Sequence, residues 1–295
     1  MANLKEIRTR ISSVASTKQI TNAMKMVSAS KLRRAQDAII QIRPYANKLQ
    51  EILADVSDSL VGDEDNLYSQ VREIEKVLFV LITSNKGLCG AFNSNITKAS
   101  INLANEEYGN LLRSGNLHFL SIGRHGGDYL TKRQYTVVDK KPQLLNDLRF
   151  ENVKPLGEDL ITKYVSGEYD KIIVLYNQFK NAAVQIITAE QFLPIELPEE
   201  DQYEEHHTYL DYIFEPSKHY IVTELIPRSL KIQLYKALLD SNAAEHGARM
   251  TAMHQATDNA TELLKDLRLN YNKARQASIT NEILEIVSGA EALRG

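Results

Sequence analysis

The first candidate for chemistry is a glycine-rich loop that contains the only cysteine of the chain. Residues 83–90 read Thr-Ser-Asn-Lys-Gly-Leu-Cys-Gly, between the apolar run 77–82 and helical sequence from about residue 93. A strand, a glycine-rich loop and a helix can hold phosphate on backbone amides. The loop lacks the G-x-x-x-x-G-K-[ST] pattern, and no G-x-G-x-x-G occurs. We therefore favour a tight strand-to-helix turn over nucleotide binding and expect no cofactor.

Two further groups contain reactive residue types. Cys89 would need a nearby base to act as a nucleophile, and His118 and His125 are candidates by type alone. The pair at 206–207 is His-His beside two glutamates, which are metal-ligating types. Adjacent side chains rarely converge on one ion, so a solvated loop is the better interpretation. We expect no metal site and no catalytic residue.

Composition and charge narrow the class of protein. A hydrophobic fraction of 43% and a charged fraction of 25% are typical of a soluble folded protein. One cysteine excludes an internal disulfide and suits a reducing compartment. No apolar stretch approaches the ~18–20 residues of a membrane span, and no signal sequence is apparent, so we expect a cytosolic chain that starts at Met1.

The net charge of -3 conceals a strong asymmetry. Residues 1–34 contain eight basic residues against Glu6, a net charge of +7, whereas residues 196–205 contain six acidic residues and no base. A basic helix can bind nucleic acid, a membrane surface or an acidic protein surface, or simply face solvent.

Both ends of the chain have long sequences nearly free of helix breakers. Residues 1–61 contain only Pro44 among the glycines and prolines, and residues 228–288 contain only Gly247. A 57-residue helix would be about 85 Å long, against a radius of gyration of about 19 Å for a compact chain of this size. We predict helices at 1–60 and 220–290 that pair antiparallel, with a domain inserted at 72–215. The heptad continues beyond Pro44, which predicts a kink rather than a helix end.

The N-terminal helix follows a heptad with a break in one block. Starting at Ile7, twelve of 16 seam positions are apolar, and the four exceptions are consecutive. These exceptions are Lys18, Thr21, Lys25 and Ser28, and the apolar residues there move to Ile20, Ala23, Met24 and Val27. The block indicates either a contact with something other than the partner helix or a stutter in the heptad.

The C-terminal helix has its own predicted seam and an apolar tip. Asn270 lies in the seam and could fix its register. Four of the five residues 283–287 are apolar, so this tip is either enclosed by a partner or folded back on the helix pair. The predicted seam positions are Met253, Ala256, Ala260, Leu263, Leu267, Asn270, Ala274, Ala277 and Leu284.

The inserted segment alternates strands and helices. Apolar runs predict strands at 77–82, 118–122, 171–176 and 184–188, and 135–138 is a candidate strand. The intervening sequence predicts helices at 93–113 and 157–164 and either a short helix or a loop at 124–132. Alternation with continuous apolar runs predicts an α/β sheet that is parallel at least in its first half. The last two strands are close enough in sequence to form an antiparallel hairpin.

Motifs at both ends resemble one known family. They are residues 4–11 and 17–32 at one end and 245–253, 256–260, 271–280 and 285–290 at the other, with further matches at 87–93 and 212–216. These stretches resemble the gamma subunits of F-type ATP synthases. The resemblance implies an α/β fold class: an antiparallel coiled coil of the terminal helices plus an inserted Rossmann-like α/β domain.

The resemblance also implies a function. Such a chain is the central rotor shaft inside a ring of alpha and beta subunits, on a membrane c-ring and beside an epsilon subunit. It couples proton flow to ATP synthesis or hydrolysis and has no catalytic site of its own. The implied location is the cytoplasmic face of a bacterial plasma (inner) membrane, with membrane association only through the complex and no nucleic acid partner.

Contact residues are carried over from the matching motifs. The beta-subunit contacts implied are Met24, Lys25, Arg249, Gln276 and Thr280. The residues implied in a sleeve at the top of the ring are Ile283, Leu284, Ile286 and Val287. Those implied near the c-ring and epsilon subunit are Tyr212, Ile213, Phe214 and Glu215.

Two positions depart from the family pattern, and two other hypotheses compete with the rotor. The family commonly has an acidic residue at Asn85 and alanine at Gly247, where glycine costs about 1 kcal/mol and predicts flexibility near Arg249. The alternatives are a nucleotide-binding enzyme with a coiled-coil dimerisation segment, which would need the absent phosphate loop, and a nucleic-acid-binding coiled coil. The paired terminal motifs favour the rotor subunit over both.

Overall fold

The computed structural model describes residues 4–60, 68, 72–195 and 224–292, with backbone only for residues 47 and 50–60. Within it the chain forms two compact units, one from residues 1–28 with 249–295 and one from residues 29–248. The acidic stretch 196–205, His206, His207 and the predicted contacts at 212–215 lie outside the described residues. The domain boundaries 1–60, 72–215 and 220–290 stay predictions.

The two terminal helices are continuous, as the scarcity of breakers predicts. Helix α1 spans Leu4–Leu60 and helix α7 spans Ile226–Ala292. Pro44 lies inside α1, which continues through it. Pro227 is in the first turn of α7, where a missing amide hydrogen costs nothing. No described helix is both long and apolar enough to cross a membrane.

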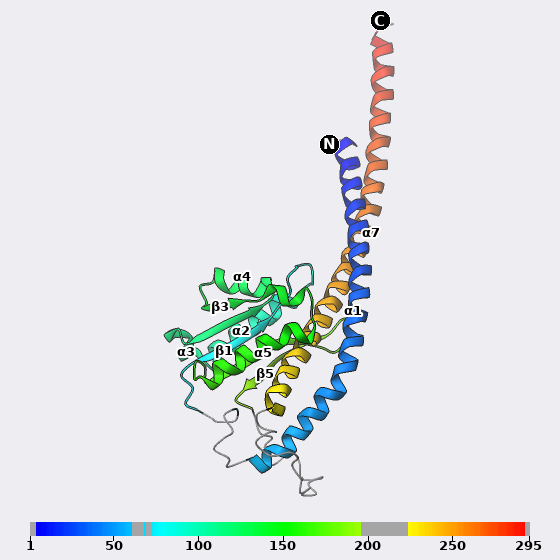
Figure 1. The fold of residues 1–295 in the computed structure, drawn as a ribbon. Coiled ribbons are helices and arrows are strands. Elements are labelled where there is room, and N and C mark those ends of the chain that lie inside the picture. Colours follow the sequence, from blue (N-terminus) through cyan, green and yellow to red (C-terminus); the bar gives the residue numbers. More distant parts are fainter. Residues whose placement is uncertain (1–3, 61–67, 69–71, 196–223, 293–295) are drawn as a thin grey trace. The chain divides into compact units, whose positions relative to one another are not determined.

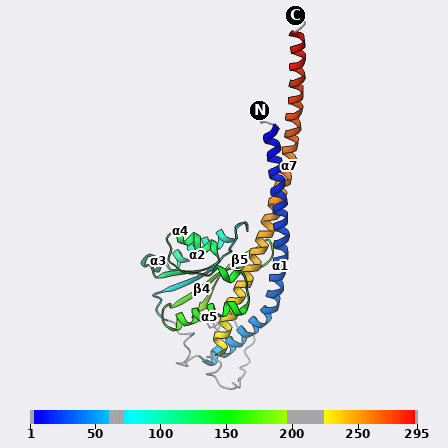
Figure 2. The same cartoon turned by 45° about the horizontal axis from the view of Figure 1, so that its top comes forward.

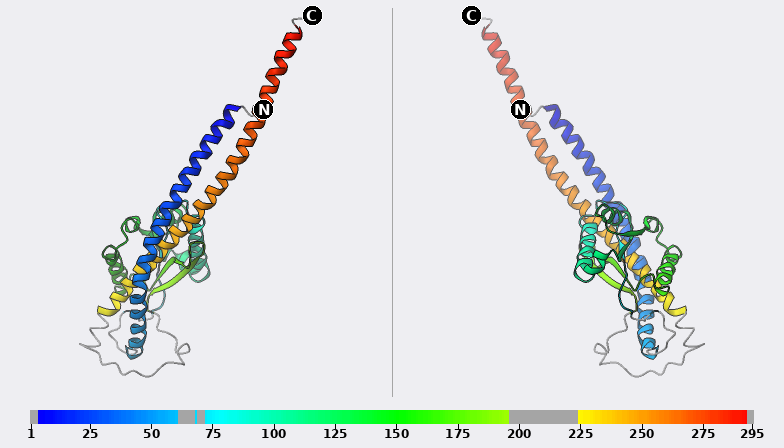
Figure 3. Two further views of the ribbon diagram at one scale, coloured as in Figure 1. Left: turned by 90° about the vertical axis from the view of Figure 1, so that its right-hand side faces the viewer. Right: turned by 90° about the vertical axis from the view of Figure 1, so that its left-hand side faces the viewer.

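The first unit is an antiparallel pair formed by the N-terminal part of α1 and the C-terminal part of α7 (Figure 3). The Thr21 and Thr257 hydroxyls are 2.8 Å apart, and Arg8 Nη2 donates to the Tyr271 hydroxyl at 2.8 Å. Both pairs give nearly the same sum of residue numbers, so the helices run antiparallel at one register. The pairing predicted from the sequence is confirmed.

The polar block of α1 remains in the seam. Thr21 and Ser28 are buried, whereas Ile20 and Val27 are 60% and 57% exposed. The stutter is therefore the wrong alternative, because the heptad keeps its phase. Thr21 and Ser28 bond to carbonyls one turn earlier, at 3.1 and 2.8 Å, so burying their hydroxyls leaves no unpaired donor.

The predicted seam of α7 is right at every second position and shifted by one residue at the others. Met253, Ala260 and Leu267 are buried as predicted. Leu264 is 7% exposed whereas the predicted Leu263 is 42% exposed, and Asn270 is exposed whereas Tyr271 is half-buried. Ala256 and Thr257 are both half-buried, and the hydroxyl of Thr257 contacts Thr21 across the seam. Asn270 therefore does not fix the register.

The second unit contains a five-stranded sheet in the order β3-β2-β1-β4-β5. The strands are β1 (Val77–Ile82), β2 (Leu117–Ile122), β3 (Val137–Lys140), β4 (Lys171–Phe179) and β5 (Gln185–Leu193). The first four are parallel, and β5 pairs antiparallel with β4 as a hairpin. The predicted mixed sheet is confirmed.

Helices cover both faces of the sheet (Figures 1 and 2). Alternate residues of β1 point to opposite faces. Phe79 packs in a core with residues of α2 (Phe92–Glu106) and α4 (Arg124–Lys132), and α3 (Gly109–Ser114) follows on the same side. Val80 packs in the other core with residues of α5 (Phe150–Val165) and the first turns of α7.

Three local predictions differ from the structure. The helix predicted at 93–113 is interrupted between α2 and α3, where Gly109 starts a new helix. Helix α5 begins at Phe150 rather than Gly157, and Pro155 lies inside it in the second turn. The earlier start places the apolar residues Val153 and Leu156 in the core, where both are buried. A short 3-10 helix, Pro142–Leu145, follows β3 and was not predicted.

Candidate functional site

The glycine-rich loop after β1 binds its own residues. Asn93 Oδ1 accepts from the Ser84 amide at 2.9 Å, and Asn93 Nδ2 donates to Ser84 Oγ at 2.7 Å and to Cys89 Sγ at 3.3 Å. Ser84 Oγ donates to the Lys86 carbonyl at 2.8 Å. Leu88 has a positive φ of 62° and Gly90 one of 59°. These contacts form the tight strand-to-helix turn that the sequence favours.

The crevice in which open α/β sheets bind ligands is filled by side chains. The strand order reverses between β1 and β4, and ligands usually bind beyond the carboxyl ends of the strands at such a point. Here Cys89 and Phe92 from the loop side pack with Ala244 of α7 as one buried cluster, joined by Phe179 at the end of β4. Helix α7 thus occupies the space that a nucleotide would need.

His118 does not support a nucleophilic Cys89. Its Nδ1 lies 2.9 Å from the Tyr169 hydroxyl, and it pairs with Leu78 near the amino end of β1. Cys89 follows the carboxyl end of β1, so the two side chains lie at opposite ends of the parallel strands. Burial raises the pKa of Tyr169 to about 12, so its hydroxyl remains protonated at neutral pH. The pair instead joins β2 to the segment just before β4.

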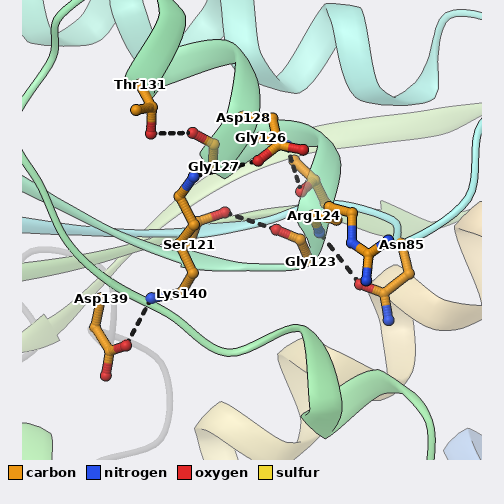
Figure 4. A network of polar contacts seen from close by, with 11 residues as sticks. Asn85, Ser121, Gly123, Arg124, Gly126, Gly127, Asp128, Thr131, Asp139 and Lys140 are labelled. Atoms are coloured by element: carbon orange, nitrogen blue, oxygen red, sulfur yellow. Dashed lines mark hydrogen bonds and ion pairs between the residues drawn. The ribbon is translucent and has the colours of Figure 1, made fainter.

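Asn85 connects the loop after β1 to helix α4 (Figure 4). Its Oδ1 accepts from the Arg124 amide at 3.2 Å, at the start of α4, and its Nδ2 donates to the Pro142 carbonyl at 2.7 Å. A carboxylate could accept the first bond but could not donate the second. The departure from the acidic residue common in the family therefore has a structural reason, because the amide bridges two segments.

The predicted beta-subunit contacts form two groups. Met24 and Lys25 are half-buried, and Arg249 is 7% exposed. The register puts Arg249 within about two helical turns of Lys25. Gln276 and Thr280 are exposed, and Gln276 is 27 residues beyond Arg249 on α7, or roughly 40 Å along a continuous helix.

The apolar tip of α7 is exposed in the isolated chain. Ile283, Leu284, Ile286 and Val287 are 55%, 60%, 71% and 53% exposed. By the register, Leu4 at the start of α1 lies opposite about residue 275, so the tip extends roughly 12–18 Å further. The alternative that the tip folds back is wrong, since α7 stays helical to Ala292.

A second exposed apolar face lies on α1. Ile20 and Val27, two turns apart, are joined by Met26 at 64% exposure. The break in the heptad identified Ile20 and Val27. Met26 was missed because it lies outside both the seam and the rotated stripe.

Among the described residues, no group of three or more His, Cys, Asp or Glu side chains could hold a metal ion.

No sequence pattern indicated a polar set in the second unit, in which Asp240 is buried and Glu190 and Gln233 are half-buried. Glu190 of β5 accepts from the Tyr176 hydroxyl at 2.9 Å and from Gln233 Nε2 of α7 at 2.8 Å. Asp240 of α7 is fully buried, with Arg43 Nη2 at 3.5 Å from its Oδ1. Burial raises the pKa of Asp240, and the Arg43 guanidinium opposes this shift. Asp240 is a single acidic residue in an alanine-rich helical stretch, so no periodic pattern in the sequence predicted its burial.

An antiparallel pair of terminal helices with an open α/β insert, and with exposed apolar residues on the pair, defines the class: a helical subunit built to contact other chains. The family model described as ATP synthase matches residues 3–293. ATP synthase gamma chains of Christiangramia forsetii and Chlorobium phaeobacteroides are 56% and 48% identical over 295 residues, covering 100% of both chains in each case. The chain therefore belongs to the ATP synthase gamma chain family.

Solved structures share the fold. The central stalk and c-ring structure of the Tetrahymena thermophila mitochondrial ATP synthase contains a chain of 25% identity with a TM-score of 0.59, covering 80% of this chain and 99% of that one. The rotor of the Euglena gracilis mitochondrial ATP synthase contains one of 21% identity with a TM-score of 0.67, covering 94% and 98%. The second likeness shows the fold alone.

Proposed function

We propose that the chain is the central-stalk rotor subunit of an F-type ATP synthase. It turns inside a ring of alpha and beta subunits and couples proton flow through a membrane c-ring to ATP synthesis or hydrolysis at the beta subunits. An epsilon subunit binds beside it. The chain is a peripheral protein on the cytoplasmic face of the bacterial plasma membrane and reaches the membrane only through the complex.

The observation that carries this proposal is the exposed apolar tip of α7. Four large apolar side chains in two turns at a helix end are costly in water, because each would gain about 1.5–3 kcal/mol on full burial. A sleeve of other subunits around Ile283, Leu284, Ile286 and Val287 supplies that burial. The sleeve must be smooth enough for the helix to turn within it.

The half-buried Met24 and Lys25 and the buried Arg249 make the contacts that change as the subunit turns. Ion pairs near a surface are weak and are screened by salt, so they can form and break at each step. We assign the same role to Gln276 and Thr280 nearer the tip. We assign Tyr212, Ile213, Phe214 and Glu215 to the contact with the c-ring and epsilon subunit.

We also infer that the chain has no catalytic site of its own. The filled crevice between β1 and β4 supports this inference. Ala244 of α7 packs there against Cys89 and Phe92, so α7 lies where a nucleotide would bind. Catalysis then belongs to the beta subunits, and this chain supplies the changing contacts that set their nucleotide affinity.

Assembly with an alpha–beta hexamer tests the proposal. We expect one copy of the chain to co-elute with each ring and to activate cooperative ATP hydrolysis. No association at micromolar concentrations would refute the rotor assignment. Tight binding to DNA with a steep dependence on salt would instead favour the nucleic-acid alternative.

Two substitutions test the proposed contact residues. Lys25→Ala and Arg249→Ala should each slow coupled turnover of the assembled complex. Lys98→Ala removes the same charge as Lys25→Ala from an exposed position on α2 and should have no effect. Because Arg249 is buried, thermal unfolding of each variant accompanies the assay. Normal turnover in both variants would show that the contact site is misplaced.

A further inference from the structure

The turn between β4 and β5 lies directly against helix α7 at Gly247. A Cβ atom at Gly247 would lie 3.1 Å from Ala182 Cα, 3.3 Å from the Ala182 carbonyl oxygen and 3.4 Å from Phe179 Cε2. The closest of these are backbone atoms, which cannot rotate away as a flexible side chain can. Glycine allows this close approach, because a Cβ would require the turn to move by a few tenths of an ångström. The flexibility predicted at this position stays a prediction.

The turn that reaches Gly247 is held in a defined shape. Asn181 Oδ1 accepts from the amides of Ala183 and Val184 at 2.9 and 2.7 Å, and the Asn181 amide donates to the Val184 carbonyl at 3.2 Å. Side-chain bonds of asparagine to the following amides pre-organise such turns. Ala182 is thus presented to α7 by a rigid turn, and apolar contacts of Phe179 with Ala244 and Ala248 surround it.

The same hairpin holds α7 at a second point. Gln233 Nε2 of α7 donates to Glu190 Oε1 at 2.8 Å, and Glu190 Oε2 accepts from Tyr176 at 2.9 Å. Gln233 is 14 residues before Gly247, about 21 Å along the helix. Between them Leu234 and Leu238 are fully buried in the core of the sheet. Two attachments separated along one helix resist both rotation about its axis and sliding.

We propose that Gly247 is a positioning residue that seats the β4–β5 hairpin on α7, so that torque applied to the α/β domain passes into α7 without slip. The proposal rests on the rotor function above. Helix α7 continues unbroken from this seat to Ala292, so a rotation imposed at Gly247 is carried along the helix. A side chain larger than that of alanine would push the hairpin away from α7, so that only Gln233 and the apolar core would still attach the hairpin to the helix.

Stability of the isolated chain gives the first test. Gly247→Ala and Gly289→Ala both replace glycine by a better helix former on α7, but a Cβ at Gly289 meets nothing within 4 Å. We expect Gly289→Ala to be neutral or stabilising and Gly247→Ala to be destabilising relative to it. Gly247→Leu should lower the folding equilibrium constant about 5- to 100-fold, as overpacking does. Equal stability of the two alanine variants would show that the contact of the β4–β5 hairpin with α7 does not depend on glycine at position 247.

Coupling in the assembled complex gives the second test. In membrane vesicles carrying the whole synthase, Gly247→Leu should lower the number of protons pumped per ATP hydrolysed, while assembly and ATP hydrolysis remain. Gly109→Leu, at a position where only the Arg113 guanidinium lies within 4 Å of an added Cβ, is the matched control in the α/β domain and should leave the ratio unchanged.

The outcomes separate the two proposals. An unchanged pumping ratio for Gly247→Leu, in a complex where the loss of stability is observed, would overturn torque transmission through the hairpin contact and leave the rotor assignment standing. Failure of the wild-type chain to assemble would overturn the rotor assignment, whereas the stability comparison would still report on the hairpin seat.

Discussion

Arg43 should be needed chiefly to neutralise the buried carboxylate of Asp240. The Asp240 side chain is fully buried, and neither of its oxygens has a hydrogen-bond partner among the described residues. The nearest cation is Arg43 Nη2 of α1 at 3.5 Å. Arg43→Ala therefore leaves an ionised group in the core of the second unit, whereas Asp240→Asn removes that charge.

The magnitude follows from the geometry. Two unit charges 3.5 Å apart attract by about 5 kcal/mol at an effective dielectric constant of about 20. The Arg43 side chain is 48% exposed, so solvent screening reduces its effect to about 2 kcal/mol. We expect Arg43→Ala to lower the free energy of unfolding by about 2 kcal/mol at pH 7, and by less than about 1 kcal/mol in an Asp240→Asn background.

The pH dependence adds a signed test. Burial raises the pKa of Asp240 above its ordinary value of 3.8. The folded state therefore retains a proton that the unfolded chain has already lost, so stability relative to Asp240→Asn is greatest below that value and falls as pH rises through the folded pKa. Because Arg43 opposes the shift, Arg43→Ala should extend this loss to higher pH.

Urea unfolding of the four chains at several pH values measures all of this. The single variants, the double variant and the wild-type chain form a thermodynamic cycle. Equal costs of Arg43→Ala with and without Asp240, or a wild-type stability that rises with pH relative to Asp240→Asn, would refute the reasoning.

Three further predictions concern the seam, the sheet and the tip. Thr21→Val should cost about 0.5–1.5 kcal/mol by removing the hydroxyl contact to Thr257, and calorimetry should find much less effect once Thr257 is also valine. Gly126→Val should cost more than about 2 kcal/mol, because even a Cβ at Gly126 would lie 2.7 Å from Thr83 Cγ2, and urea unfolding with Gly109→Val as control measures it. Leu284→Ser should leave the melting temperature of the isolated chain unchanged, since the side chain is 60% exposed, but should weaken binding to the alpha–beta hexamer by titration; an equal effect on both would contradict the sleeve.

The sequence predicts most of the fold because its signals are local. Long stretches without breakers give α1 and α7, and continuous apolar runs give the parallel strands with their hairpin. The α7 seam was right at Met253, Ala260 and Leu267 but shifted by one residue at the positions between them, since the polar Thr257 lies in the seam and only its contact with Thr21 reveals it. The close approach of Ala182 to Gly247 joins positions 65 residues apart, so no local pattern could predict it.

The candidate contact residues depended on motif resemblance rather than on periodicity. The heptad break correctly marked Ile20 and Val27 as different from the seam, and their exposure agrees with this. Burial of Arg249 could not be predicted, because a charged residue in a helical pattern is ordinarily exposed. The ion pair of Arg43 with Asp240 joins two helices from opposite ends of the chain, and no local pattern records it.

Observation of rotation tests the central claim most directly. Lys98 is exposed on α2, so a Lys98→Cys variant can carry a probe in a complex with an immobilised alpha–beta hexamer, while the native Cys89 is buried. With ATP present, we expect stepwise rotation of the probe in one direction, at a rate that follows ATP hydrolysis. Sustained hydrolysis by complexes in which the bound chain stays at a fixed angle would contradict it.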